Sequence, residues 1–198
     1  MARTIAKDHD QKRARILKTA AEVFAEEGVS RASMSQVAKA CGISKANIYH
    51  YYDGRDTLLF DMLDSYLSAL RDRMRDLPLS GLSPEERLRR IIRETLLAYD
   101  GMDAEHKIQT EGIPLLPSDQ QDVLKGYQRD LVKQLADVLA EAAPDAFDSD
   151  KHKLRSATMS VYGMLNWFYM WSGGADKKAR EAYADLVTDL TLSGVRSL

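Results

Sequence analysis

The side chains most able to do chemistry lie between residues 33 and 55. They combine hydroxyls, an ammonium, a guanidinium, an amide and aromatic rings with polar tips, groups that hydrogen-bond to base edges and to phosphate oxygens. A merely solvated helix face more typically carries Glu and Lys. We expect Lys45 and Arg55 mainly to hold phosphates. The candidate DNA-contacting residues are Ser33, Ser44, Lys45, Asn47, Tyr49, His50, Tyr51 and Arg55.

No comparable set of residues indicates catalysis or a metal site. The four histidines show no ligand spacing. The single cysteine, Cys41, is predicted to be a small core residue rather than a redox sensor. A glycine-rich phosphate loop and a nucleophile elbow are both absent from the sequence. We therefore expect no enzyme activity, no cofactor and no bound metal.

Two short helices around a turn must position the DNA-contacting residues. Ser33 and Gln36 have the spacing of a capping box, which predicts a helix start. Gly42 stands where the chain must turn sharply, and a second helix is expected at residues 44–51. The spacing of Ala38, Gly42 and Ile48 is that of a helix-turn-helix. The alternative is a helical hairpin with a structural role only.

The rest of the chain also has helical periodicity, with no strand-like alternation of useful length. Residues 101–117 are predicted as a short helix and a loop. Longer helices are expected at about residues 10–27, 55–77, 150–171 and 175–195, and others opening at Ser83 and Ser118. The prediction is an all-α protein of about nine helices.

Composition and charge fit a protein that works in solution. The 198 residues carry 28 Lys and Arg against 30 Asp and Glu. Residues 1–55 have a net charge of +4 and the remainder has −6, so one end is suited to face a polyanion. The longest nearly apolar run, 11 residues at 161–171, is too short to span a bilayer. No signal peptide is visible, and we expect a cytoplasmic protein without membrane contact.

The run from Gln11 to Met62 resembles the TetR family of bacterial repressors. Ala46, Tyr52 and Arg55 stand where that family usually has Gly, Phe and Lys. The matching segments are Phe24-x-x-x-Gly28, Ser33-Met34-Ser35-Gln36-Val37-Ala38, Gly42-Ile43-Ser44-Lys45 and Ile48-Tyr49-x-x-Tyr52-x-x-Arg55-x-x-Leu58. The resemblance implies a homodimer of all-helical subunits. Each would have a three-helix DNA-binding head, residues 8–54, and a ligand-binding and dimerisation body, residues 55–198.

This resemblance implies a ligand-responsive transcriptional regulator, in the first place a repressor, that binds a palindromic operator. The last two long helices would pair with their copies, and residues 150–195 are expected to form most of that interface. The alternative is a helical architectural or interaction protein that binds DNA without an effector. An apolar cavity within residues 84–171 would distinguish the two.

The body is rich in Met, Leu and aromatic residues, which favours an apolar effector. The segment Gly163–Trp171 resembles a subset of TetR-like regulators that sense CoA thioesters. Under this hypothesis the CoA phosphates would lie near Arg129 or Arg155. The alternative is that Trp167 and Trp171 only pack the dimer. The candidate effector contacts are Tyr99, Met102, Tyr162, Asn166, Trp167 and Met170.

Overall fold

The computed structural model describes residues 2–147 and 150–197, in which helices and turns occur without β-strands. This confirms the prediction of an all-α protein. The chain forms two compact units, Met1–Ser68 with Asp103–Lys125 and Ala69–Met102 with Gly126–Leu198. The predicted head, residues 8–54, falls within the first unit, while its boundary at residue 55 stays a prediction. No described helix has both the length and the apolar composition needed to cross a bilayer.

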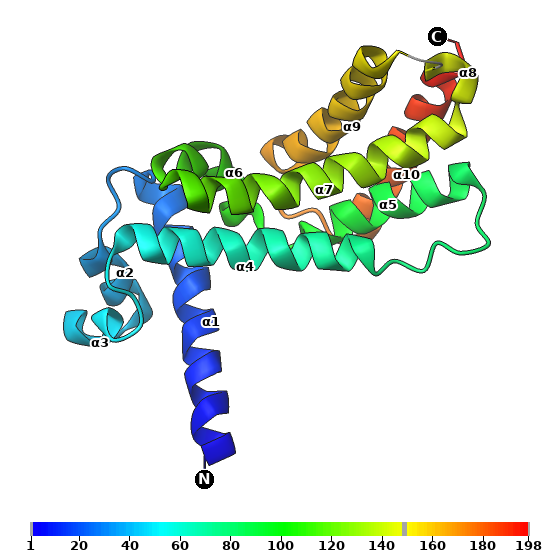
Figure 1. Ribbon diagram of the computed structural model, residues 1–198. Helices are drawn as coiled ribbons and strands as arrows, with labels where there is room; N and C mark the ends of the chain where they lie inside the picture. Colours follow the sequence, from blue (N-terminus) through cyan, green and yellow to red (C-terminus); the bar gives the residue numbers. More distant parts are fainter. Residues whose placement is uncertain (1, 148–149, 198) are drawn as a thin grey trace. The chain divides into compact units, whose positions relative to one another are not determined.

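The first unit contains the three N-terminal helices, the start of the fourth helix and a second segment at residues 103–125. Helices α4 and α7 contribute residues to both units. The elements of the first unit are α1 (Ala2–Glu27), α2 (Met34–Cys41), α3 (Lys45–Tyr49), the start of α4 (Arg55–Arg75), α6 (Asp103–Gly112), η1 (Ile113–Leu115) and the start of α7 (Ser118–Ala142) (Figure 1).

Helix α1 is longer than the sequence predicts. Periodicity indicated a start near Asp10, but the helix begins at Ala2. Residues 2–9 contain neither Gly nor Pro, so nothing in them breaks a helix. The C-terminal end is as predicted, because Gly28 adopts a left-handed φ of 86°. The apolar stripe through Ile16, Ala20 and Phe24 is buried.

Local hydrogen bonds define both ends of α2 and the start of α3, as predicted, whereas α3 ends at Tyr49, two residues before the expected end at residue 51. Ser33 and Gln36 form a complete capping box at the start of α2. Gly42 ends that helix with φ 67°, and its N–H donates to the carbonyls of Ala38 and Lys39. Ser44 then caps α3. The two helices are thus held around a turn that favours glycine.

The second unit holds the remaining helices. A helix opens at Ser83, as predicted: Ser83 and Glu86 form a capping box before α5, and Pro84 is at its first position. Asp150 caps the start of the helix at residues 151–171, and Asp176 caps the start of the helix at residues 177–195. Besides parts of α4 and α7, the unit contains α5 (Pro84–Ala98), α8 (Pro144–Phe147), α9 (Lys151–Trp171) and α10 (Lys177–Val195).

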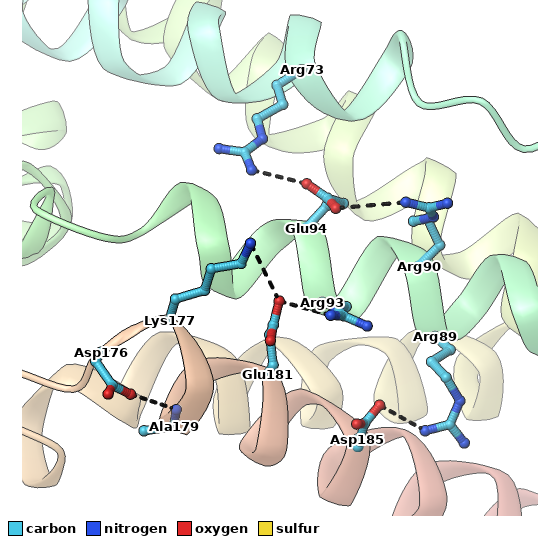
Figure 2. A network of polar contacts seen from close by, with 10 residues as sticks. All are labelled: Arg73, Arg89, Arg90, Arg93, Glu94, Asp176, Lys177, Ala179, Glu181 and Asp185. Atoms are coloured by element: carbon cyan, nitrogen blue, oxygen red, sulfur yellow. Dashed lines mark hydrogen bonds and ion pairs between the residues drawn. The ribbon is translucent and has the colours of Figure 1, made fainter.

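Helices α5 and α10 are joined by ion pairs along their length (Figure 2). Arg93 Nη2 lies 2.7 Å from Glu181 Oε1. Arg89 reaches Asp185 at 3.0 Å and Asp189 at 2.6 Å. These contacts direct one charged face of α10 toward α5.

Candidate functional site

Helix α3 presents the predicted DNA-contacting residues to solvent. Lys45, Asn47, Tyr49 and His50 are exposed. Ile48 on the opposite side is fully buried and anchors the helix to the first unit. A short helix held by one apolar residue therefore displays an ammonium, an amide, a phenol and an imidazole together. These groups are able to read base edges and phosphates.

The two predicted serines have different roles in the helix caps. Ser44 Oγ accepts a hydrogen bond from the N–H of Asn47 at 3.1 Å. The cap uses Ser44 only as an acceptor, so its O–H can still donate to a phosphate oxygen. Ser33 Oγ accepts from the N–H of Gln36 at 3.3 Å and donates to Gln36 Oε1 at 2.7 Å. The Ser33 hydroxyl is thereby engaged within its own capping box.

Tyr51 and Arg55 lie beyond the end of α3. The half-buried ring of Tyr51 stacks on the imidazole of His9, with centroids 5.0 Å apart and planes at 25°. Sequence reasoning did not single out His9. Arg55 donates from Nη1 to the carbonyl of Ser30 at 3.0 Å and pairs with Asp56 at 3.2 Å. Arg55 therefore ties the start of α4 to the turn after α1, and a phosphate contact for it stays a prediction.

Tyr52, where the resembled family usually has Phe, uses its hydroxyl within the first unit. Tyr52 Oη donates to Asp61 Oδ2 at 2.6 Å, and Arg13 pairs with the other oxygen of that carboxylate. Burial raises the pKa of Tyr52, and the hydrogen bond to Asp61 raises it further. Burial opposes the charge on Arg13, yet the contact with Asp61 leaves the pKa of Arg13 raised. The three residues brace α1 against α4.

Helix α6 is attached to α1 and α4 in the same unit. Lys107 Nζ donates to the carbonyl of Ala25 at 2.8 Å, near the end of α1. Tyr66 Oη and His106 Nδ1 are 3.1 Å apart in a buried hydrogen bond. A Cβ at Gly112 would lie 3.3 Å from a methyl of Leu59, so the absence of a side chain permits close packing. Lys107 and Ala25 are 82 positions apart in the sequence, so this contact joins segments that are distant along the chain.

In the second unit, the structure brings two candidate effector contacts together, Tyr99 and Asn166. Tyr99 and Tyr162 are buried, and Tyr99 Oη donates to Asn166 Oδ1 at 2.9 Å. An amide on an otherwise apolar helix needs a hydrogen-bond partner, and Tyr99 provides it. Burial raises the pKa of Tyr162, so its phenol stays neutral. Met102 is half-buried.

The other two candidate contacts, Trp167 and Met170, are 60% and 54% exposed. Both belong to α9, and α10 also carries exposed large apolar residues. An apolar hollow of about 250 Å³ lies between these helices, next to Met164 and Leu190. We define the α9–α10 apolar face as Met159, Trp167, Met170, Trp171, Leu186 and Leu190, all of them exposed. A patch of large apolar side chains on one chain indicates a surface that a partner covers.

A groove of about 440 Å³ in the second unit is lined by two arginines, Arg71 and Arg75. Arg71 pairs with Asp72 at 2.6 Å and lies over the ring of Tyr127 at 4.7 Å. Arg75 pairs with Asp72 and with Asp76. These carboxylates offset the positive charge of the two arginines. Among the described residues, no three His, Cys, Asp or Glu side chains could hold a metal ion together.

Comparisons with known proteins cover both parts of the chain. Residues 16–62 match the family model described as "Bacterial regulatory proteins, tetR family". Residues 81–195, more than half of the chain, match the model described as "Tetracyclin repressor-like, C-terminal domain".

Among curated relatives, the chain is similar to the HTH-type transcriptional repressor KstR2 of Rhodococcus jostii (strain RHA1). The two are 28% identical over 95 residues, which make up 48% of this chain and 45% of the relative. The match thus spans about half of that relative's length. KstR2 of Mycobacterium tuberculosis (strain ATCC 25618 / H37Rv) is 24% identical over 144 residues, 72% of each chain.

Solved structures extend the similarity over nearly the whole chain. A TetR-family transcriptional regulator from Bordetella parapertussis 12822 has a TM-score of 0.85 and 31% identity, covering 94% of this chain and 96% of its own. AibR in complex with isovaleryl coenzyme A and operator DNA has a TM-score of 0.73 and 23% identity, covering 90% and 97%. FadR from Bacillus subtilis in complex with stearoyl-CoA has a TM-score of 0.68 and 18% identity, covering 91% and 98%. The likeness to AibR and FadR shows a shared fold.

Proposed function

Because the chain belongs to the TetR family of bacterial transcriptional regulators, we propose that it is a homodimeric repressor whose hydrophobic effector releases it from a palindromic operator. Operator DNA lies in the bacterial cytoplasm, so the proposal places the protein there. The exposed polar face of α3, capped by Ser44 and anchored by Ile48, is the observation that carries the proposal.

For DNA, the proposal assigns the base-reading role to α3. Asn47, Tyr49 and His50 are exposed and would lie nearest the bases, together with the O–H of Ser44. Lys45 would hold a phosphate. The start of a helix also favours an anion through its unpaired N–H groups. Two heads related by a two-fold axis would read half-sites about one helical turn apart.

For the effector, we propose an acyl-CoA thioester whose acyl group lies against Tyr99, Met102, Tyr162 and Asn166. Two phenols and one amide would give an apolar pocket a few polar contacts, which is common in small-molecule sites. AibR and FadR, which share the fold, are described with isovaleryl coenzyme A and stearoyl-CoA. The exposure of Trp167 and Met170 favours a place for them on the subunit interface.

For assembly, we propose that the α9–α10 apolar face is covered by the same face of a second copy. A two-fold contact of this kind is self-complementary. It would need to bury more than about 1,000 Å² in total to be stable. Six large apolar side chains on two adjacent helices are suited to such a contact.

The test begins by enriching a DNA duplex from a random-sequence library with the unaltered protein. Acyl-CoA thioesters of increasing chain length, and the matching free acids, are then titrated into the protein–duplex complex. We expect the thioesters to release the protein and the free acids to be weaker. Release by neither set, well above micromolar concentrations, would contradict the acyl-CoA assignment. A duplex that no ligand releases would favour an architectural DNA-binding protein.

A further inference from the structure

Helix α1 reaches the end of α3 through one aromatic contact. The imidazole of His9 stacks on the ring of Tyr51, with centroids 5.0 Å apart and an interplanar angle of 25°. The two residues are 42 positions apart in the chain and belong to the same compact unit. Helix α1 begins at Ala2, so His9 lies within the helix.

The backbone of Tyr51 is already fixed before its ring is considered. Its N–H donates to the carbonyl of Ile48 at 3.0 Å, and Ile48 is fully buried. The ring of a half-exposed tyrosine can still occupy more than one χ1 rotamer. A flat imidazole stacked on one face of the ring restricts that choice. The stack with His9 therefore restricts where the Tyr51 ring lies.

We propose that His9 is a positioning residue for DNA recognition: it holds the Tyr51 ring in place at the end of α3 before DNA binds. This inference rests on the proposed function and adds α1 to the elements that shape the DNA-contacting surface. A side chain ordered in advance loses less conformational entropy when the complex forms. The benefit is thus higher affinity without a direct contact between His9 and DNA.

The geometry indicates that His9 positions the Tyr51 ring by stacking on it and not through a charge on the imidazole. Rings at 25° with centroids 5.0 Å apart have the arrangement of an offset stack, which a neutral ring can make equally well. The nearby carboxylate is that of Asp10, whose Oδ1 lies 3.9 Å from His9 Nδ1 in an exposed pair. A phenyl ring at residue 9 should therefore replace the imidazole, whereas a methyl group should not.

The experiment compares His9→Ala and His9→Phe with the unaltered protein, using the duplex that the unaltered protein enriches from a random-sequence library. We expect His9→Ala to weaken binding about threefold to tenfold, and His9→Phe to restore it to within about twofold. The dependence of affinity on salt should be the same for all three proteins, because no phosphate contact is lost. Gln11→Ala, an exposed change two residues along α1, is the matched control.

A double-mutant cycle tests whether His9 acts through Tyr51. If it does, His9→Ala should cost little further affinity once Tyr51→Ala is present, since neighbours that act together are not additive. Urea unfolding of each variant checks that the fold is intact, and both His9 variants should unfold close to the unaltered protein. Additive losses in the cycle would contradict the inference.

Other outcomes separate this inference from the proposed function. If His9→Phe binds as weakly as His9→Ala and the salt dependence falls, His9 contacts phosphate directly and the positioning role is wrong. If Lys45→Ala weakens binding but His9→Ala does not, the inference fails and the proposed function stands. A protein that enriches no duplex overturns both.

Discussion

At the scale of single residues, Lys45 is the first residue of α3 and its ammonium is exposed to solvent. We expect Lys45→Ala to weaken binding to every DNA sequence and to lower the salt dependence of affinity by about one unit, as the loss of one phosphate contact should. Fluorescence anisotropy over a range of salt concentrations measures both. Lys133→Ala removes an exposed lysine of α7, outside the head and outside the proposed dimer interface, and should change neither. An unchanged salt dependence in Lys45→Ala would contradict the assignment of α3.

Glu105 in α6 gives a second prediction at this scale, on stability and pH. Burial raises the pKa of Glu105, partly opposed by a backbone hydrogen bond and by Lys18. Because the folded state favours the protonated acid, ionisation of Glu105 lowers stability as the pH rises above the ordinary Glu range. Glu105→Gln should therefore raise the free energy of unfolding at neutral pH, and the gain should disappear in acid. Urea unfolding at several pH values measures it. Glu111→Gln, an exposed change in the same helix, is the control.

At the scale of elements, α5 and α10 depend on side-chain contacts that span about a hundred residues. Arg89 bridges Asp185 and Asp189, and the hydrogen bond to Asp189 is the main reason that the pKa of Arg89 is raised. In a double-mutant cycle, Arg89→Ala and Asp189→Ala should show a coupling of about 0.5 kcal/mol in unfolding free energy, since partly exposed pairs are weak. About 1 M salt should remove most of that coupling. A coupling of zero at low salt would show that the pair does not fasten α10.

Element starts and stops were the features that the sequence could predict. Capping boxes at Ser33 and Ser83 and the turn at Gly42 are local signals, and all three are as expected. The early start of α1 was missed because periodicity alone marks only the part of a helix that packs. Some contacts join segments that are far apart in the chain, such as Lys107 with the Ala25 carbonyl and His9 with Tyr51. Neither of the two joined segments carries a sequence pattern that would predict such a contact. The types and spacing of the residues thus indicated which side chains of α3 are exposed. The residues that hold the head together could be identified only from the three-dimensional structure.

At the scale of the whole molecule, the α9–α10 apolar face determines assembly under our proposal. Leu186 and Leu190 are 52% and 57% exposed, so a charged side chain at either position can reach solvent without disturbing the core of one subunit. We expect Leu190→Lys to give folded monomers, because a buried unpaired ammonium is costly in an apolar contact. These monomers should lose tight binding to a two-fold-symmetric duplex although their heads are unchanged, since only one half-site can then be held.

Native mass spectrometry measures the subunit count, and urea unfolding shows whether each subunit stays folded. The matched control is Leu115→Lys, which places the same charge at an exposed leucine of η1 and should leave both assembly and DNA binding intact. If Leu190→Lys remains a dimer, a different surface joins the subunits. If the unaltered protein is a monomer at micromolar concentration, the homodimer itself is wrong, and the six exposed side chains of the α9–α10 apolar face need another partner.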